Sequence, residues 1–559
     1  MRKREGIEPR NICKPWVPTP LVRRKAKPEE PRAKAPEGPP GSETVACQQG
    51  IVGNSGDPMC SSGTTGGRVA QPANREETRR QMGSRMSPYE RGSGVTPAEQ
   101  RGAHPAADSM ETSSTHRGGK RAETGVESIA RRARRHPTEK FTALMHHYTE
   151  ENLRACFESL KKTEATGVDG VTLEAYRRNL DENLKVLAGK LRRMSYRPKP
   201  VRRVEIPKAD GKARPLGISC TEDKIVQEMT RRILEAIYEP EFVETSYGFR
   251  PKRSCHDALR RLNAEMMQKP VEAVVDLDVA QFFDEMPHKA ILEVLGERIG
   301  DKKFLRLIAR MFKAGVQTPS DVLYDELGSP QGSIVSPVIA NVFLDKVLDQ
   351  WFYKIVKKHC HGYSEILRYA DDALAVFENR RDAERFMKVL PHRLQKFGLR
   401  LNVQKTHLVE FGKRGAQTRI ASGKRPPTLD FLGFTHYWGL SRKGKVRLKR
   451  KTSKKRLRRS LVTINNWLRT NRSKQNLRQL WKVLSSKMRG YYNYFGVTDN
   501  SKALRQFHYV VRRLLYKWLN RCSQRRRFTW ESFNRYQAKF PLPRPRIRVQ
   551  LNPRWRTAG

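Results

Sequence analysis

The spacing of apolar residues separates an irregular beginning of the chain from a patterned remainder. Residues 1–128 show no sustained helical or strand period, and Gly, Pro, Ser, Thr and Arg are frequent among them. Such a segment cannot bury enough apolar surface to offset the entropy that is lost on ordering. We therefore expect a disordered basic tail there, with translation from an internal methionine such as Met82, Met86 or Met110 as an alternative.

Helical spacing appears at two places in the remainder of the chain. Apolar residues three and four positions apart predict helices over 141–162 and 173–191, joined by a turn at GVDG, 167–170. Short strands, turns and helices then alternate. From 452 to 522 the pattern becomes helical again, and Arg and Lys fill many of the positions between the apolar residues. This last segment predicts an all-helical basic domain.

Two segments in the middle of the chain carry acids in strand-like patterns. Apolar residues alternate with acids over 274–279, as in a half-buried strand, and Asp278 lies near the end of this segment. The apolar run 366–377 is interrupted by Asp371 and Asp372, which predicts a β-hairpin with these acids at its tip. We expect the two segments to be neighbours in one antiparallel sheet.

Adjacent carboxylates repel each other unless a cation neutralises them, and oxygen ligands of this kind suit Mg²⁺. Two Mg²⁺ ions held by Asp278, Asp371 and Asp372, roughly 4 Å apart, could activate an attacking hydroxyl and stabilise a leaving pyrophosphate. The structural alternative is that these residues are surface acids of a turn and of an amphipathic strand.

Charge identifies the class of partner. The 559 residues include 111 Lys and Arg against 58 Asp and Glu, a formal net charge of +53. Such an excess causes self-repulsion unless a polyanion is bound, and this favours nucleic acid. An anionic membrane is the competing interpretation, but the mean hydropathy is −0.74 and no apolar stretch approaches the length of a spanning helix. A functional alternative for the disordered basic tail is then a flexible arm that binds RNA.

The eight cysteines are scattered without a CxxC pair, which disfavours zinc fingers and disulfides and fits a reducing compartment. No apolar segment near residue 1 is typical of a secretory signal. We therefore expect a cytoplasmic protein that is associated with nucleic acid and not with a membrane.

Eight short segments occur in an order that resembles the bacterial group II intron-encoded reverse transcriptase/maturase family. They are GVDG at 167–170, IPKADGKARPLGI at 206–218, SYGFRP at 246–251, DVAQFFD at 278–284, GSPQGS at 328–333, YADD at 369–372, LNVQKT at 401–406 and FLGF at 431–434. The resemblance implies an α+β right-hand polymerase with an antiparallel palm sheet and an all-helical basic thumb, or maturase X domain.

The resemblance also implies a division of the chain. The expected parts are a disordered tail (1–128), the reverse transcriptase fingers and palm (129–415), the end of the palm with a linker (416–451), the helical thumb (452–522) and a basic C-terminal extension that could contact DNA (523–559). Few residues follow Phe540 and none is Cys or His, so the HNH endonuclease of many family members is expected to be absent.

By the same resemblance, Asp278, Asp371 and Asp372 are the catalytic metal ligands, and the Val279 carbonyl is an additional candidate ligand. Lys208 and Arg214 flank a turn and would bind the triphosphate of a deoxynucleotide; the alternative is an ordinary basic β-turn.

Three further residues complete the nucleotide site that the resemblance implies. Phe283 would exclude a 2′-hydroxyl by steric contact, unless it and Phe282 are simply core residues. Gln331 would hydrogen-bond the template, and Lys405 would lie near the phosphates.

The implied partners are the intron RNA, an RNA template, a DNA primer or target, and deoxynucleotides. Tyr491, Tyr492 and Tyr494 among the basic helices suit stacking on unpaired RNA bases, whereas Trp467 and Trp481 are expected in the bundle core. Two alternatives stay open: a splicing cofactor with little polymerase activity, and a retron, diversity-generating or CRISPR-associated reverse transcriptase. The sequence does not identify the oligomeric state.

Overall fold

The computed structural model of this chain describes residues 125–160, 165–207, 213–317, 322–323, 328, 332–521 and 528–551. The chain divides into two compact units, 1–113 and 114–559, and every described residue belongs to the second. The predicted tail therefore lies outside the described residues, except at its end. There the prediction is wrong, because helix α1 (Val126–Arg135) already begins within it and buries Ile129 and Ala133.

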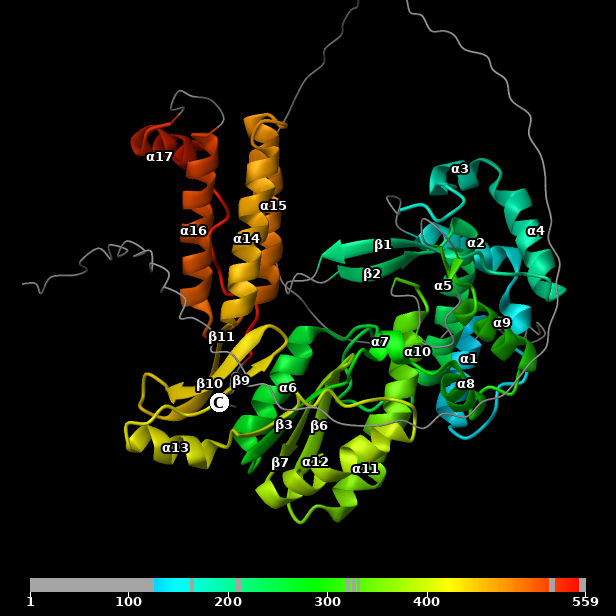
Figure 1. The fold of residues 1–559 in the computed structure, drawn as a ribbon, viewed down its shortest axis with the longest axis horizontal. Coiled ribbons are helices and arrows are strands. Elements are labelled where there is room, and N and C mark those ends of the chain that lie inside the picture. Colours follow the sequence, from blue (N-terminus) through cyan, green and yellow to red (C-terminus); the bar gives the residue numbers. More distant parts are fainter. Residues whose placement is uncertain are drawn as a thin grey trace, which may run out of the picture. The chain divides into compact units, whose positions relative to one another are not determined.

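Helices gather around α5 in the first part of the described chain, shown in blue to green in Figure 1. The helix predicted over 141–162 is shorter than expected, because the side chain of Thr149 accepts a hydrogen bond from the Asn152 amide and caps a new helix start. The helix predicted over 173–191 is interrupted at Asn179. The elements are η1 (Met145–His147), α2 (Glu150–Ser159), α3 (Leu173–Arg178), α4 (Leu180–Arg192) and α5 (Thr221–Tyr238).

A β-hairpin leads out of these helices. Its strands β1 (Val201–Pro207) and β2 (Ala213–Ile218) are antiparallel, and Pro207 lies opposite Ala213 at the end where the chain connects the two strands. Two short strands, β4 (Val316–Gln317) and β5 (Val322–Leu323), extend it to a sheet of order β2-β1-β4-β5.

The central sheet has the order β6-β7-β3-β8, and all its neighbouring strands are antiparallel. This confirms the small antiparallel sheet expected from the acidic strand and hairpin. Its strands are β3 (Ala273–Asp278), β6 (Ser364–Tyr369), β7 (Asp372–Phe377) and β8 (His407–Glu410).

Both faces of the central sheet are covered, which explains why its strands are apolar at almost every position. Val275 and Ala375 enter the core that they share with helix α12 (Arg380–Gln395). Val274 and Val376 enter a second core, which they share with helix α6 (Cys255–Gln268). The second core continues into the helices near the end of the chain.

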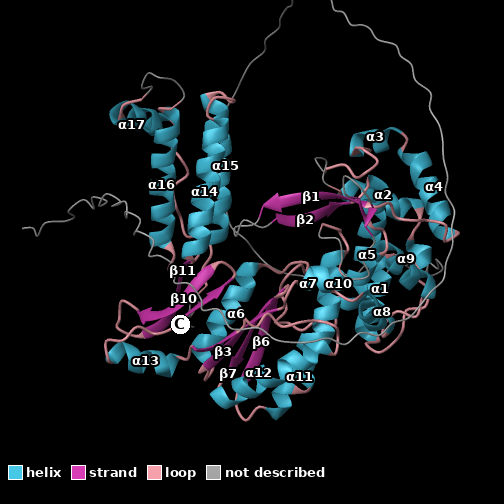
Figure 2. Cartoon of the chain, in the orientation of Figure 1, coloured by secondary structure: helices cyan, strands magenta, loops and turns pink. Residues whose placement is uncertain are grey.

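Several helices connect the strands (Figure 2). One continuous run includes a π-helical segment, η2, between two α-helical parts. The connecting elements are α7 (Phe282–Glu285), α8 (His288–Gly296), α9 (Lys302–Phe312), α10 (Ser336–Leu344), η2 (Asp345–Asp349), α11 (Gln350–Lys354) and η3 (Val356–His359).

A three-stranded sheet and a helical bundle form the rest of the described chain. The sheet, of order β11-β10-β9, consists of β9 (Thr428–Phe431), β10 (Phe434–Leu440) and β11 (Val446–Thr452), and α13 (Lys413–Ala421) precedes it. The bundle contains α14 (Lys454–Asn471), α15 (Leu477–Phe495) and α16 (Ser501–Leu519), and α17 (Trp530–Lys539) follows. The described end of the chain packs onto the bundle, where Leu551 is buried and Val549 pairs with Val497.

The aromatic residues of the bundle are mostly internal. Tyr491 stacks on Phe507 with ring centroids 3.6 Å apart, and both Tyr491 and Tyr492 are buried. The prediction that these two tyrosines stack on RNA bases is therefore wrong for this structure, because their rings already pack against α16. Trp481 is buried as expected. Among the helices of the described residues, none combines the length and the hydrophobicity that a membrane-spanning segment needs.

Candidate active site

Three carboxylates meet at one end of the central sheet. The β6–β7 hairpin turns at Ala370 and Asp371, so that Tyr369 lies opposite Asp372. Strand β7 then runs antiparallel to β3 and places Asp372 directly opposite Asp278. Sequence patterning predicted both the hairpin tip and the neighbouring strand, and the structure brings these two parts together.

A glycine from a distant segment supports the tip of the hairpin. A Cβ atom on Gly248 would lie 2.2 Å from the Ala370 amide nitrogen, so the two backbones are in direct contact. Ala370 itself has a φ of 59°, a left-handed conformation that is costly for a residue with a side chain. The SYGFRP segment thus contributes a surface against which the strained turn rests.

A buried arginine, Arg368, stabilises the same turn through hydrogen bonds. The Arg368 guanidinium donates a hydrogen bond of 3.0 Å to the Ala370 carbonyl and one of 2.9 Å to Asn341 Oδ1. It also pairs with Asp349 at 2.6 Å between Nη2 and Oδ2, and both side chains are almost completely buried. Asn341 in turn donates to the Gly248 carbonyl at 2.6 Å. These contacts join the turn, the π-helical segment and the SYGFRP segment into one network.

The charges at the sheet end perturb one another. Desolvation, then repulsion from Asp371 and Asp278, raises the pKa of Asp372 to about 6, although its side chain reaches solvent. Lys405 and Arg456 act in the opposite direction on this pKa. Burial, followed by repulsion from Asp372 and Asp278, raises the pKa of Asp276 to about 7. Neighbouring carboxylates that raise one another's pKa are typical of a site that binds cations.

Asp278 is held by partners from a distant segment. Its Oδ2 atom accepts a hydrogen bond of 2.8 Å from Asn402 Nδ2 and lies 2.9 Å from Lys405 Nζ. Both partners come from the LNVQKT segment, whose Asn402 amide also donates to the Asp278 carbonyl at 2.9 Å. Lys405, predicted to lie near nucleotide phosphates, therefore lies beside the carboxylates and at present binds one of them.

A cavity of about 530 Å³ adjoins these groups. Its lining includes Asp278, Val279, Phe283, Asp371 and Lys405, so five of the predicted site residues share one space. Phe282 also reaches the cavity wall but is 3% exposed, whereas Phe283 is only partly buried. The two adjacent phenylalanines therefore have different environments, and Phe283 is the one available to a ligand.

Two glycines attach the GSPQGS segment to the surroundings of this cavity. A Cβ atom on Gly328 would lie 2.7 Å from the Asp284 carbonyl oxygen, and one on Gly332 would lie 2.5 Å from the Gly217 carbonyl oxygen. The first contact is beside Phe283 and the second is on strand β2. The two described glycines thus contact the surroundings of the cavity and the β1–β2 hairpin, respectively.

Three residues that were predicted to bind the nucleotide or the template lie wholly or partly outside the description. Lys208 and Gln331 lie outside the described residues. Arg214 is placed in strand β2 opposite Ile206, but its side chain is outside the description. Strands β1 and β2, on either side of the predicted turn, pair antiparallel, and the turn itself at 209–211 lies outside the described residues.

The carboxylate oxygens of the site are suitable ligands for a divalent cation, although the side chains are not arranged around a common point in this structure. Within the described ranges, no group of three or more His, Cys, Asp or Glu side chains is positioned to hold a metal ion. Asp278 and Asp371 nevertheless both act on the pKa of Asp372, so the three carboxylates interact. Carboxylate oxygens are the ligands that Mg²⁺ prefers. The contacts of Asp278 with Asn402 and Lys405 both involve its Oδ2 atom.

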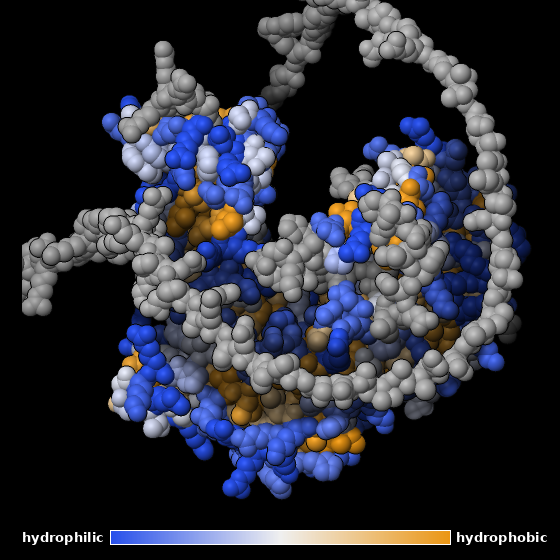
Figure 3. Space-filling view, viewed as in Figure 1, coloured by the Kyte–Doolittle hydropathy of each residue, from blue (hydrophilic) through white to orange (hydrophobic). Residues whose placement is uncertain are grey.

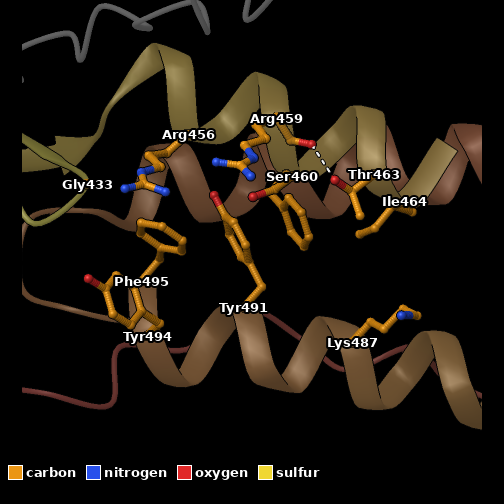
Figure 4. Close-up of a pocket in the computed structure, with 11 residues that line it drawn as sticks. Gly433, Arg456, Arg459, Ser460, Thr463, Ile464, Lys487, Tyr491, Tyr494 and Phe495 are labelled. Carbon is orange, nitrogen blue, oxygen red and sulfur yellow. Dashed lines mark hydrogen bonds between the residues drawn. The ribbon is translucent and has the colours of Figure 1, made fainter. Parts of the chain in front are cut away.

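A second cavity, of about 600 Å³, lies between helices α14 and α15. Figure 4 shows Arg456 and Arg459 on one helix facing Tyr491 and Phe495 on the other. Arg456 also lowers the pKa of Asp372, so this cationic groove begins within electrostatic reach of the carboxylates. Tyr494, which lines it too, donates a hydrogen bond of 2.9 Å to the Leu432 carbonyl of the FLGF segment.

Sequence patterns did not reveal the residues that support the site from within. Arg368, Asp349 and Asn341 are buried polar residues within apolar segments, and no sequence pattern indicates that they contact one another. The one available signal was the position of Arg368 directly before YADD, since a cation inside a buried strand needs a partner.

Two family models match this chain. Residues 206–436 match the model described as reverse transcriptase (RNA-dependent DNA polymerase). Residues 454–536 match the model described as group II intron, maturase-specific domain. The two matches confirm the coarser part of the predicted resemblance, a reverse transcriptase segment followed by a group II intron maturase segment.

Curated relatives match smaller portions. The group II intron-encoded protein LtrA of Lactococcus lactis subsp. cremoris is 32% identical over 235 residues, 42% of this chain and 39% of LtrA. Protein YkfC of Escherichia coli K12 is 35% identical over 199 residues, 35% of this chain and 52% of YkfC. An uncharacterized 91 kDa protein in the cob intron of Schizosaccharomyces pombe is 45% identical over 148 residues, 26% of this chain and 18% of that protein.

The aligned regions therefore span about half or less of these relatives. Because they include proteins of bacteria and of a yeast, the similarity does not by itself identify a bacterial origin.

Proposed function

We propose that this chain is an RNA-directed DNA polymerase of a group II intron, which also binds the intron RNA and assists its splicing. The observation that carries this proposal is the cavity that joins Asp278, Asp371, Phe283 and Lys405 at the end of an antiparallel sheet. That cavity lies inside the segment that matches the reverse transcriptase model. A helical basic segment that matches the maturase model follows it.

In this proposal the architecture is that of a right-hand polymerase. The helices around α5 and the β1–β2 hairpin are the fingers, and the central sheet is the palm. The bundle α14–α16 is the thumb, and the segment from 528 to 551 is an extension that packs on the thumb. The groove between α14 and α15 would receive nucleic acid next to the palm, since cations line it within reach of the catalytic carboxylates.

Asp278, Asp371 and Asp372 would hold two Mg²⁺ ions, with the Val279 carbonyl as an additional candidate ligand. Bound Mg²⁺ would activate the primer hydroxyl and stabilise the leaving pyrophosphate. Lys405 is able to bind either the Asp278 carboxylate or a phosphate, since both are anions. We propose that it contacts the triphosphate of the deoxynucleotide in the loaded site, together with Lys208 and Arg214. Gln331 would contact the template.

Primer extension on an RNA template tests the polymerase. Asp371→Ala/Asp372→Ala is expected to abolish DNA synthesis with deoxynucleotides and Mg²⁺, while binding of the intron RNA changes less than threefold. The matched control is Glu174→Ala/Glu182→Ala, which removes two exposed acids from other elements and should retain full synthesis. DNA synthesis by the double aspartate variant would contradict the assignment of the site.

Splicing of a precursor that contains the chain's own intron tests the maturase role separately. The wild-type chain is expected to accelerate splicing, and the Asp371→Ala/Asp372→Ala variant should do so equally well, because splicing would depend on RNA binding and not on polymerisation. A chain that promotes splicing but never extends a primer would instead support the splicing cofactor with little polymerase activity.

A further inference from the structure

A second cationic site lies away from the polymerase cavity, at the turn between β10 and β11. It is a cavity of about 480 Å³, and five of its seven lining residues are cationic. It shares no lining residue with the cavity around Asp278. Its five cationic residues also lie between the two family matches, which end at residue 436 and begin at residue 454, whereas Asp499 lies within the second match. We call its cations, with the strand residues that continue them, the cationic hairpin: Arg442, Lys443, Lys445, Arg447, Lys449 and Lys451.

The strand part of the cationic hairpin presents its charges in a row. Arg447, Lys449 and Lys451 alternate on β11 with buried Leu448 and Arg450, so they point to the same side of the sheet. Alternate residues of an antiparallel strand are about 6.8 Å apart, which separates the cations regularly. Such a row matches a chain of repeated negative charges better than a single small anion.

Little negative charge compensates these cations. Asp499 is the one acid in the lining, and both its carboxylate oxygens are bound by Arg447 Nη2, at 3.1 and 3.2 Å. Arg442, Lys443 and Lys445 form no ion pair with any other described residue, and all three are exposed. In a chain whose net charge is already +53, this concentration of charge is unfavourable unless a polyanion neutralises it.

Hydrogen bonds fix the backbone of the hairpin at both ends of β11. The Ser441 amide donates to the Lys445 carbonyl at 2.8 Å, and the Lys445 amide donates back to Ser441 Oγ at 3.1 Å. At the other end of β11, the Thr452 amide donates to Asn500 Oδ1 at 2.8 Å. The cations are therefore carried on a fixed frame, which reduces the entropy that binding would cost.

The lining also indicates which part of a nucleic acid would bind. No aromatic or aliphatic side chain lines this cavity, so it offers phosphates strong partners but gives bases nothing to stack on. We propose that the cationic hairpin binds the phosphodiester backbone of the intron RNA, outside the path of primer and template. This inference rests on the proposed function, because it takes the intron RNA as the partner.

The test compares two full-length variants with the same loss of charge. Arg442→Gln/Lys443→Gln/Lys445→Gln removes three exposed cations of the hairpin. Lys302→Gln/Lys303→Gln/Lys388→Gln removes three exposed lysines from α9 and α12 and is the control. The measured quantities are the Kd for the intron RNA as a function of salt, the Kd for a DNA duplex, and primer extension on a short oligonucleotide template.

The hairpin variant is expected to bind the intron RNA roughly tenfold more weakly at 0.15 M salt, with a salt dependence reduced by about two counterions. Primer extension should match the wild type, and the control variant should bind RNA as the wild type does. Equal losses in both variants would overturn the proposal, because they would reflect net charge alone. A loss confined to the DNA duplex would also overturn it.

The two hypotheses fail in different ways. If the wild type extends no primer, the proposed polymerase is contradicted, while the comparison of RNA binding by the two variants still decides the role of the hairpin. If the wild type is active and both variants bind RNA equally, only the cationic hairpin is contradicted.

Discussion

At the tip of the central sheet, residues of the same type lie in different environments. Asp278 is neutralised by Lys405 and hydrogen-bonded by Asn402, whereas the pKa of Asp372 is raised to about 6 by desolvation and by its acidic neighbours. Phe282 is buried and Phe283 faces the cavity. Single substitutions can therefore distinguish catalytic, packing and electrostatic contributions.

Sugar selectivity depends on Phe283 if the proposed site is correct. We expect Phe283→Val to increase the ratio of kcat/KM for a ribonucleotide to that for the matching deoxynucleotide roughly tenfold, because a smaller side chain leaves room for the 2′-hydroxyl. Single-nucleotide primer extension measures the ratio. Phe282→Val is the control: it should reduce stability while leaving the ratio unchanged. An unchanged ratio for Phe283→Val would remove this assignment.

Asp223 provides a prediction of pH dependence that is independent of catalysis. Burial raises the pKa of Asp223 to about 6, although the Tyr196 hydroxyl and the Lys199 amide donate hydrogen bonds to it. Because the folded pKa exceeds the unfolded value of about 3.9, this carboxyl favours folding below pH 4 and loses that contribution as the pH rises through 6.

Asp223→Asn should therefore become more stable relative to wild type between pH 4 and pH 8, by about 3 kcal/mol at most. Urea unfolding at both pH values measures the difference. Asp181→Asn, at an exposed position, is the control and should show no such trend. A difference that is independent of pH would show that Asp223 is already ionised at pH 4 in the folded chain.

At the scale of elements, the Arg368–Asp349 pair connects strand β6 to the π-helical segment. Asp349→Leu leaves the Arg368 charge buried without its counterion, and should lower the free energy of unfolding by about 3–5 kcal/mol. Arg368→Met/Asp349→Leu removes both charges and should recover most of that loss. Denaturant unfolding of the three proteins measures both effects.

Activity should not recover together with stability. The double variant still lacks the hydrogen bond from Arg368 to the Ala370 carbonyl, so primer extension should stay well below wild type. Equal stability of the single and double variants would mean that the pair contributes no specific interaction. Full activity in the double variant would show that the turn does not depend on Arg368.

The elements that sequence could predict are those whose pattern is local. Alternation identified β3, and the apolar run around YADD identified the β6–β7 hairpin, because each strand buries its own residues. The break at Asn179 and the early start of α1 were missed, since helix limits depend on capping and on tertiary contacts. The network of Arg368, Asp349 and Asn341 was also missed, because its members meet only after the sheet and helices have packed.

At the scale of the molecule, the excess of cationic side chains is expected to determine how strongly the chain binds RNA. The full sequence carries a formal net charge of +53. Figure 3 shows hydrophilic residues over much of the visible face of the described part. We expect affinity for the intron RNA to fall by about 10³-fold or more between 50 and 200 mM salt, as bound counterions are released. Filter binding over this range measures the dependence. A decrease of less than tenfold would show that contacts other than phosphate dominate.

The π-helical segment at 345–349 imposes a constraint on the length of the chain. Each residue of an α-helix advances the side chain by about 100° around the axis, and a π segment accommodates an additional residue without adding a turn. Deleting one residue between 345 and 349 would yield a regular helix, but would rotate Asp349 or the whole of α11 away from its present neighbours. A deletion or insertion in this segment should therefore lower stability more than a single substitution does, because it changes the number of residues and not only the identity of one.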